Sequence, residues 1–104
     1  MNEIWMPHAG HFCGASLCRF RLNTYVNGYI ISTVGEYVSG NRTKFEEIGL
    51  NRLYETMVFE AVKSNHKCCP YEINLDKEVD FEGYNDAESA TKGHYDMIKK
   101  WKDV

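Results

Sequence analysis

The sequence lacks any apolar run near the roughly 20 residues that cross a membrane. Its amino terminus has neither the basic start nor the apolar stretch of a secretory leader. These absences predict a cytoplasmic protein with no membrane contact. Because disulfides rarely persist in that compartment, the four cysteines are expected to be reduced or metal-bound.

Basic residues are also scarce, because 12 Lys and Arg stand against 15 Asp and Glu and leave a net charge of -3. This balance argues against direct nucleic-acid binding, which normally needs a basic surface that neutralises phosphates. The chain has no Gly-x-x-x-x-Gly-Lys loop, no Gly-x-Gly-x-x-Gly turn, no Gly-x-Ser-x-Gly elbow and no His-Glu-x-x-His helix. The usual nucleotide-binding and hydrolase folds are therefore not indicated.

The composition that is present is typical of one globular domain spanning residues 1–104. Hydrophobic residues make up 43% of the chain and charged residues 26%, which supports a packed core and argues against disorder. A domain of roughly 100 residues buries enough apolar surface to fold without obligatory crosslinks. We therefore expect a single compact unit.

A β-hairpin is the clearest local signal. Apolar and polar residues alternate over residues 18–26, which predicts a strand with one buried face. Asn-Gly follows at residues 27–28 and predicts a two-residue turn, because both residues tolerate a positive φ. The second strand then covers residues 29–37, and the turn sets a register in which Phe20 lies opposite Gly35.

Two further strands and a helix complete the expected fold. Residues 54–63 are rich in β-branched and aromatic side chains and predict a third strand, although a helical stripe also fits. Residues 69–75 predict a short edge strand. A helix over about 86–101, with Asn85 as N-cap, has an apolar side that would pack on the sheet. The predicted class is α+β, in which a small antiparallel sheet, the hairpin 18–37 plus the strand near 54–63, is covered by the C-terminal helix.

Thiol and imidazole side chains gather in two short windows, residues 8–18 and 66–69. Zn²⁺ favours these ligands in tetrahedral geometry, so a zinc site is one hypothesis. The candidate ligands are His8, His11, Cys13, Cys18 and Cys69. The spacing differs from the paired knuckles of structural zinc sites. The alternative is that the histidines cap a loop and the cysteines fill the core as small hydrophobic residues.

Three titratable residues are candidates for catalysis. His94 lies on the apolar side of the predicted helix and follows Gly93, a glycine that suggests a close backbone approach. Its mid-range pKa suits proton transfer, but a hydrogen-bonded core histidine is the alternative. Glu36 and Glu55 could act as acid or base beside the N-terminal histidines. Their alternative is a surface role, paired with Arg19 or a lysine.

An acidic stretch is a candidate surface for a partner. Residues 72–88 contain seven acidic residues and one lysine. Such a field could dock a basic surface of another protein, and the candidate contacts are Glu72, Asp76, Glu78, Asp80 and Glu82. The alternative is a solvated loop that leads into the helix N-terminus, where acidic residues are favoured.

Several segments resemble a group of small bacteriophage and prophage proteins of unassigned function, and together they cover most of the chain. They include Met-Pro-His-Ala-Gly-His-Phe, Cys-Arg-Phe-Arg-Leu-Asn-Thr-Tyr-Val, Tyr-Glu-Thr-Met-Val-Phe and Asp-Phe-Glu-Gly-Tyr-Asn-Asp-Ala. The resemblance implies a small accessory protein that acts inside a bacterial host by binding host machinery. It carries over no catalytic residue.

Two functional hypotheses follow. The first is a phage-type accessory protein that binds and modulates a host protein, such as a defence factor or a nucleic-acid-processing factor. The second is a zinc-dependent hydrolase that uses the His/Cys cluster, with Glu36 or Glu55 as general base. An open cleft that holds a metal would separate the second hypothesis from the first.

Overall fold

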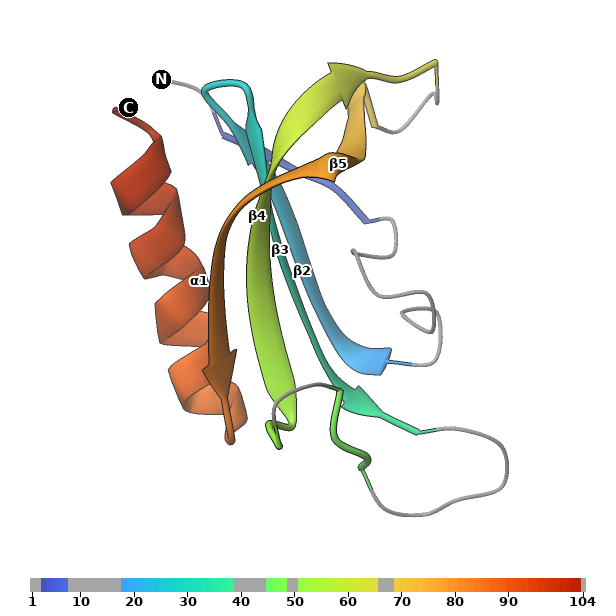
Figure 1. The fold of residues 1–104 in the computed structure, drawn as a ribbon, viewed down its shortest axis with the longest axis vertical. Coiled ribbons are helices and arrows are strands. Elements are labelled where there is room, and N and C mark those ends of the chain that lie inside the picture. Colours follow the sequence, from blue (N-terminus) through green and yellow to red (C-terminus); the bar gives the residue numbers. More distant parts are fainter. Residues whose placement is uncertain (1–2, 8–17, 39–44, 49–50, 66–68, 104) are drawn as a thin grey trace.

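Figure 1 shows the fold in the computed structural model, which describes residues 3–7, 18–38, 45–48, 51–65 and 69–103. Within these ranges five antiparallel strands form one sheet, ordered as they occur in the chain, and one helix packs against it. The elements are β1 (Ile4–Trp5), β2 (Cys18–Val26), β3 (Tyr29–Tyr37), β4 (Tyr54–Lys63), β5 (Tyr71–Tyr84) and α1 (Ala87–Trp101). The predicted α+β class is confirmed. No helix in this part of the chain is long and apolar enough to cross a membrane.

The hairpin of β2 and β3 has the predicted turn and register. Asn27 and Gly28 adopt φ values of 53° and 87°, as this type of turn requires. Phe20 lies opposite Gly35. The ring that covers Gly35 comes from Tyr54 of β4, and it meets Phe20 edge-on with a centroid distance of 5.2 Å. A side chain at position 35 would collide with this ring, so the glycine permits the close packing of β3 and β4.

Strand β5 is much longer than the predicted edge strand. It continues past Leu75 to Tyr84, so the first part of the acidic stretch is a strand and not a solvated loop. Residues 71–73, 78 and 80–84 of β5 pair with β4, while most of the acidic side chains of the strand remain exposed. The register shifts around Phe59 of β4. Figure 1 shows that β5 bends as it crosses the sheet. Strand formation therefore does not require the carboxylates to lose their water.

Helix α1 covers one face of the sheet, as Figure 1 shows. The main core on this side is a cluster of Val26, Ile31 and Val58 from three strands with Met97 and Ile98 from the helix. The predicted N-cap was wrong by one residue. Asp86 caps the helix, since its carboxylate accepts the backbone N–H of Ser89 at 2.7 Å. Asp86 has extended backbone angles, which direct its carboxylate at the first turn.

The opposite face of the sheet holds two smaller apolar clusters. One contains Met6, Ile30 and Cys69, and the other contains Cys18 and Val34. Both cysteines are buried in them. The molecule therefore has core on both faces of the sheet, although α1 covers only one of them.

Candidate functional site

A buried hydrogen-bonded centre joins α1 to the sheet around His94. Its Nε2 lies 2.9 Å from the hydroxyl oxygen of Thr24, and its Nδ1 lies 2.6 Å from that of Thr33. The Thr33 hydroxyl lies a further 2.6 Å from the hydroxyl of Thr56. These threonines belong to β2, β3 and β4. One imidazole thus links the helix to three neighbouring strands.

His94 has no contact with solvent, because its exposed fraction is 0%. Burial lowers the pKa of His94 to about 4, so the ring is neutral at pH 7 and carries one donor and one acceptor nitrogen. The indole of Trp5 covers it at a centroid distance of 5.2 Å. This environment suits a structural connection between helix and sheet. A proton transfer to a bound substrate would need an exposed nitrogen, which this geometry does not provide.

The close approach predicted at Gly93 is present. The hydroxyl of Tyr84, from β5, lies so near Gly93 that a Cβ there would overlap it. Burial raises the pKa of Tyr84, and its hydroxyl also hydrogen-bonds with Thr56. The glycine therefore allows β5 to reach the same polar centre that His94 occupies.

The two carboxylates proposed for catalysis, Glu36 and Glu55, lie in separate surroundings away from His94. Glu36 has a φ of 54° and accepts a hydrogen bond from the Tyr54 hydroxyl at 2.8 Å. Burial and this bond raise the pKa of Tyr54 to about 12. Glu55 is buried and precedes Thr56 in β4, so its side chain lies on the sheet face opposite the Thr56 hydroxyl and His94. The structure therefore does not assemble Glu36, Glu55 and His94 into one site.

The metal-ligand candidates are only partly within the described residues. Cys18 packs with Val34, whereas Cys69 packs with Met6 in the other cluster, so the two thiols are not brought together. Burial raises the pKa of Cys18, which keeps it a neutral thiol. His8, His11 and Cys13 lie outside the described residues. Among the residues that are described, no three His, Cys, Asp or Glu side chains gather to hold a metal ion. The zinc site remains a prediction.

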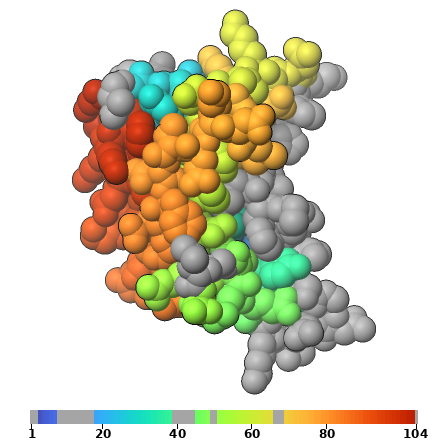
Figure 2. Space-filling model, viewed as in Figure 1, coloured from blue at the N-terminus to red at the C-terminus, as the bar shows by residue number. Residues whose placement is uncertain are grey.

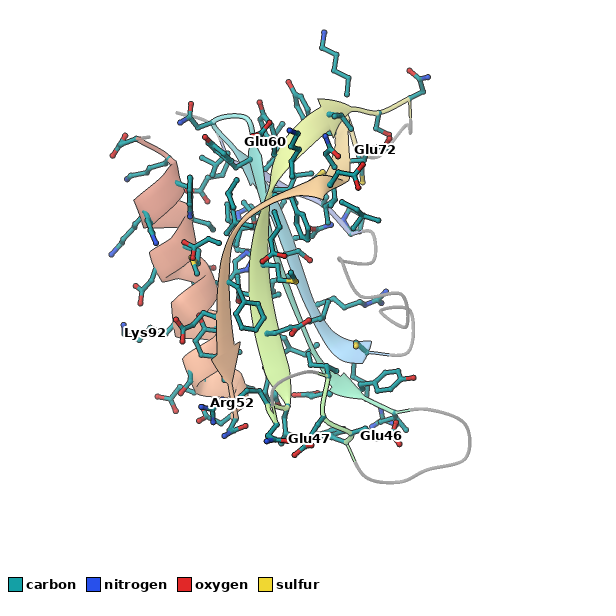
Figure 3. The ribbon with its side chains drawn as sticks, viewed as in Figure 1. Glu46, Glu47, Arg52, Glu60, Glu72 and Lys92 are labelled. Carbon is teal, nitrogen blue, oxygen red and sulfur yellow. The ribbon has the colours of Figure 1, made fainter. Side chains whose placement is uncertain are left out.

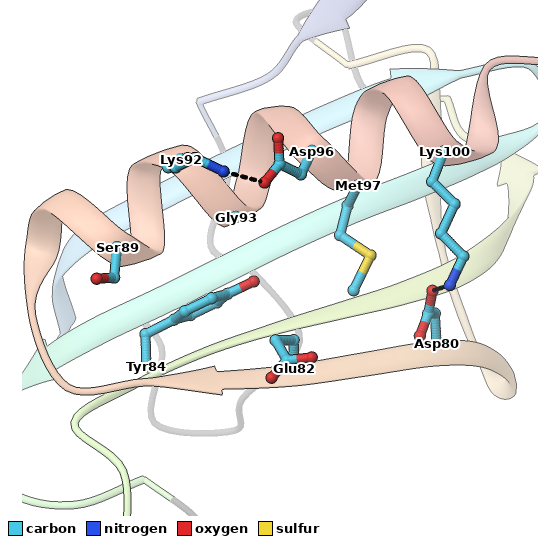
Figure 4. A pocket seen from close by; sticks show the side chains of 9 residues that line it. All are labelled: Asp80, Glu82, Tyr84, Ser89, Lys92, Gly93, Asp96, Met97 and Lys100. Atoms are coloured by element: carbon cyan, nitrogen blue, oxygen red, sulfur yellow. Dashed lines mark hydrogen bonds and ion pairs between the residues drawn. The ribbon is translucent and has the colours of Figure 1, made fainter.

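A groove of about 440 Å³ opens between β5 and α1, a feature that the sequence reasoning did not identify (Figure 4). Glu82 and Tyr84 line it from the strand. On the helix side, Lys92 and Asp96 form an ion pair at 2.8 Å, but both side chains are more than half exposed. The groove is therefore open, and charged side chains from both elements line it beside apolar ones such as Met97. Gly93, which lines the groove, was the only residue in the sequence analysis that pointed to this part of the molecule.

Asp80 connects β5 to the carboxyl end of α1. Its Oδ2 accepts hydrogen bonds from Nζ of Lys100 at 2.7 Å and from Nε1 of Trp101 at 3.0 Å. Its Oδ1 accepts the backbone N–H of Phe81 at 2.8 Å. Burial opposes ionisation of Asp80, but these hydrogen bonds outweigh it and lower the pKa of the carboxyl group. Of the five predicted partner contacts, Asp80 is thus the one used within the fold.

The other four predicted contacts, Glu72, Asp76, Glu78 and Glu82, are exposed. Leu75, which lies between Glu72 and Glu78 in the strand, is 68% exposed. Val79, which follows Glu78, is 38% exposed. We call the exposed side chains of residues 72–79 the β5 surface. Figure 2 shows β5 in orange crossing the front of the molecule beside α1 in red, and Figure 3 marks Glu72 near its start.

Among the described residues, the groove beside α1 and the β5 surface are accessible, whereas the polar centre around His94 is not. Leu75 is the most exposed of the large apolar side chains, which also include Trp5, Phe45, Val62 and Tyr95. The β5 surface combines carboxylates with exposed apolar side chains. Comparison with known proteins found no family, no curated protein and no solved structure that matches this chain.

Proposed function

We propose that this protein acts by binding another protein through the β5 surface. In this proposal it is a small phage-type accessory protein that modulates or inhibits a host protein, such as a defence factor or a nucleic-acid-processing factor. The observation that carries it is the exposure of Leu75 at 68% among the carboxylates of an outermost strand. Val79 adds a second exposed apolar side chain on the same strand. An apolar centre with a polar rim is the usual anatomy of a protein interface.

The interior placement of the reactive side chains supports a binding role. His94 is engaged by two threonine hydroxyls, and Cys18 and Cys69 lie in apolar clusters. None of these three groups lines the groove between β5 and α1. The resemblance to phage and prophage proteins supports the context, a bacterial host, but not the identity of the partner.

A capture experiment tests the proposal with two matched variants. The first, the β5-neutral variant, carries Glu72→Gln, Asp76→Asn and Glu78→Gln. The control carries the same loss of charge at exposed positions elsewhere, Glu47→Gln, Glu88→Gln and Asp103→Asn. The wild type and the control are expected to retain one stoichiometric protein from bacterial lysate, and the β5-neutral variant to lose it.

Thermal melts should show that all three proteins are folded, because the replaced side chains are exposed. Recovery of no stoichiometric protein by the wild type would contradict the proposal. Equal recovery by all three proteins would contradict the use of the β5 surface.

A further inference from the structure

We propose that residues 71–79 of β5 receive an extended, lysine- or arginine-rich segment of the partner, which adds to the sheet as a further strand. This inference rests on the proposed function and names the chemistry of the segment that is bound. It is carried by the position of β5 in the sheet, by its register with β4 and by its charge.

The position of β5 leaves a long strand at the edge of the sheet. In the described strand order β5 is the last strand and pairs with β4, and it has 14 residues. The strand at the other edge, β1, has 2 residues. Exposed edges bind extended segments through backbone hydrogen bonds, and a longer edge offers more of them. Of the two edges, β5 is therefore the one that can accept a segment of useful length.

The register narrows the docking site to the first part of β5. Ile73 pairs with Ala61 and Glu78 pairs with Phe59, so residues 74–77 have no Cα partner in β4. Beyond this stretch, the N–H of Phe81 already donates to Asp80. At Phe81 the backbone donor is therefore engaged within the fold. In the preceding stretch the N–H of Asp76 donates to Oδ1 of Asn74 at 3.2 Å, but this contact is exposed and an incoming strand would displace it. The side chains of residues 75–79 are exposed as well.

The charge of this segment selects the occupant. Glu72, Asp76 and Glu78 outweigh Lys77, so a segment with alternating basic residues would place opposite charges across the new strand pair. Apolar residues between them would contact Leu75 and Val79. A second copy of this chain would instead place carboxylates opposite carboxylates, which is unfavourable. Charge therefore favours a basic partner over self-association.

A synthetic ten-residue peptide of alternating lysine and valine is the probe, and the backbone amide shifts of the full-length protein are the readout. We expect saturable shifts centred on residues 71–79. The β5-neutral variant should bind about tenfold more weakly, because three exposed charge pairs are lost. The charge-matched control variant should bind as the wild type does. A peptide N-methylated at alternate residues keeps its charge but loses one edge of backbone donors, and it should also bind at least tenfold more weakly.

Three results would overturn the inference. Equal binding of the N-methylated peptide would mean that charge alone holds it, and the absence of binding by the unmodified peptide would remove the site. A dimer of the wild-type protein in sedimentation, with an interface that maps to β5, would make a second copy the occupant. The lysate capture is a separate test of the proposed function. If capture still depends on the β5 surface, any of these three results overturns only the added basic strand and leaves the proposed function standing.

Discussion

Replacing His94 with glutamine should remove a large part of the acid sensitivity of this fold. The ring is fully buried against Thr24, Thr33 and Trp5, and burial is the cause of its low pKa. A protonated imidazole would lose its acceptor nitrogen. It would also place a charge in an interface where, among the described residues, its ring nitrogens are bonded to threonine hydroxyls and to no carboxylate. Acid should therefore act on the fold through this residue.

The magnitude follows from the two pKa values. The pKa of His94 is lowered from 6.5 to about 4 in the folded chain. Between these values the unfolded chain binds more protons, so the free energy of unfolding is unaffected above pH 6.5 and falls as the pH falls toward 4. One pKa unit corresponds to about 1.4 kcal/mol, so roughly 2.5 kcal/mol would be lost by about pH 4.5.

Urea unfolding followed by tryptophan fluorescence, from about pH 7 to about pH 4.5, measures this loss. At neutral pH the His94→Gln variant should be less stable by about 1–3 kcal/mol, because threonine hydroxyls lose their ring partner. Its further loss on acidification should be smaller than that of the wild type by roughly 2.5 kcal/mol. An exposed control, Lys99→Gln, should follow the wild type. Parallel pH profiles for wild type and His94→Gln would refute the reasoning.

Three other predictions concern the Asp80 contacts, the close approach at Gly93 and the zinc hypothesis. Asp80→Ala should lower the free energy of unfolding by about 1–3 kcal/mol, since Trp101 Nε1 and a backbone N–H lose their acceptor; Asp96→Ala, at an exposed ion pair, should lower it clearly less, and equal losses would contradict this account. Gly93→Ala should lower the melting temperature because of the overlap with Tyr84, and the same change should cost less in a Tyr84→Ala background, where the ring is absent; a rise in the melting temperature of Gly93→Ala, as helix propensity alone predicts, would argue against the overlap. The zinc hypothesis predicts one zinc per chain of untagged protein by elemental mass spectrometry and a lower melting temperature with chelator; no metal and an unchanged melt would exclude it.

The β-hairpin and the helix show how far local patterns lead. The Asn-Gly turn and the alternation over residues 18–26 predicted the register of β2 and β3 correctly, because the turn length sets every pair that follows it. The helix was also predicted, but its N-cap was off by one residue. Asn85 and Asp86 are both good caps, and the choice depends on which of them has extended backbone angles at the end of β5.

Strand β5 and the candidate sites show where local patterns fail. Acidic residues disfavour strands, so the pattern ended the edge strand near Leu75, whereas pairing with β4 extends it to Tyr84. The separation of Cys18 from Cys69 could not be inferred from the sequence, because it depends on which apolar cluster receives each side chain. The groove beside Gly93 depends in the same way on how β5 meets α1.

The sequence by itself determined the α+β class, the hairpin, the helix and the burial of the His94 side of α1. These features depend on residues a few positions apart, whose turn chemistry and periodicity act locally. Only the tertiary structure decided that His94 meets Thr24 and Thr33, which lie 70 and 61 positions away, and that Asp80 is used internally while Glu72 and Leu75 remain exposed. The physical reason is that strand pairing and helix docking bring distant residues together, and the competition between burial and solvation is settled only there.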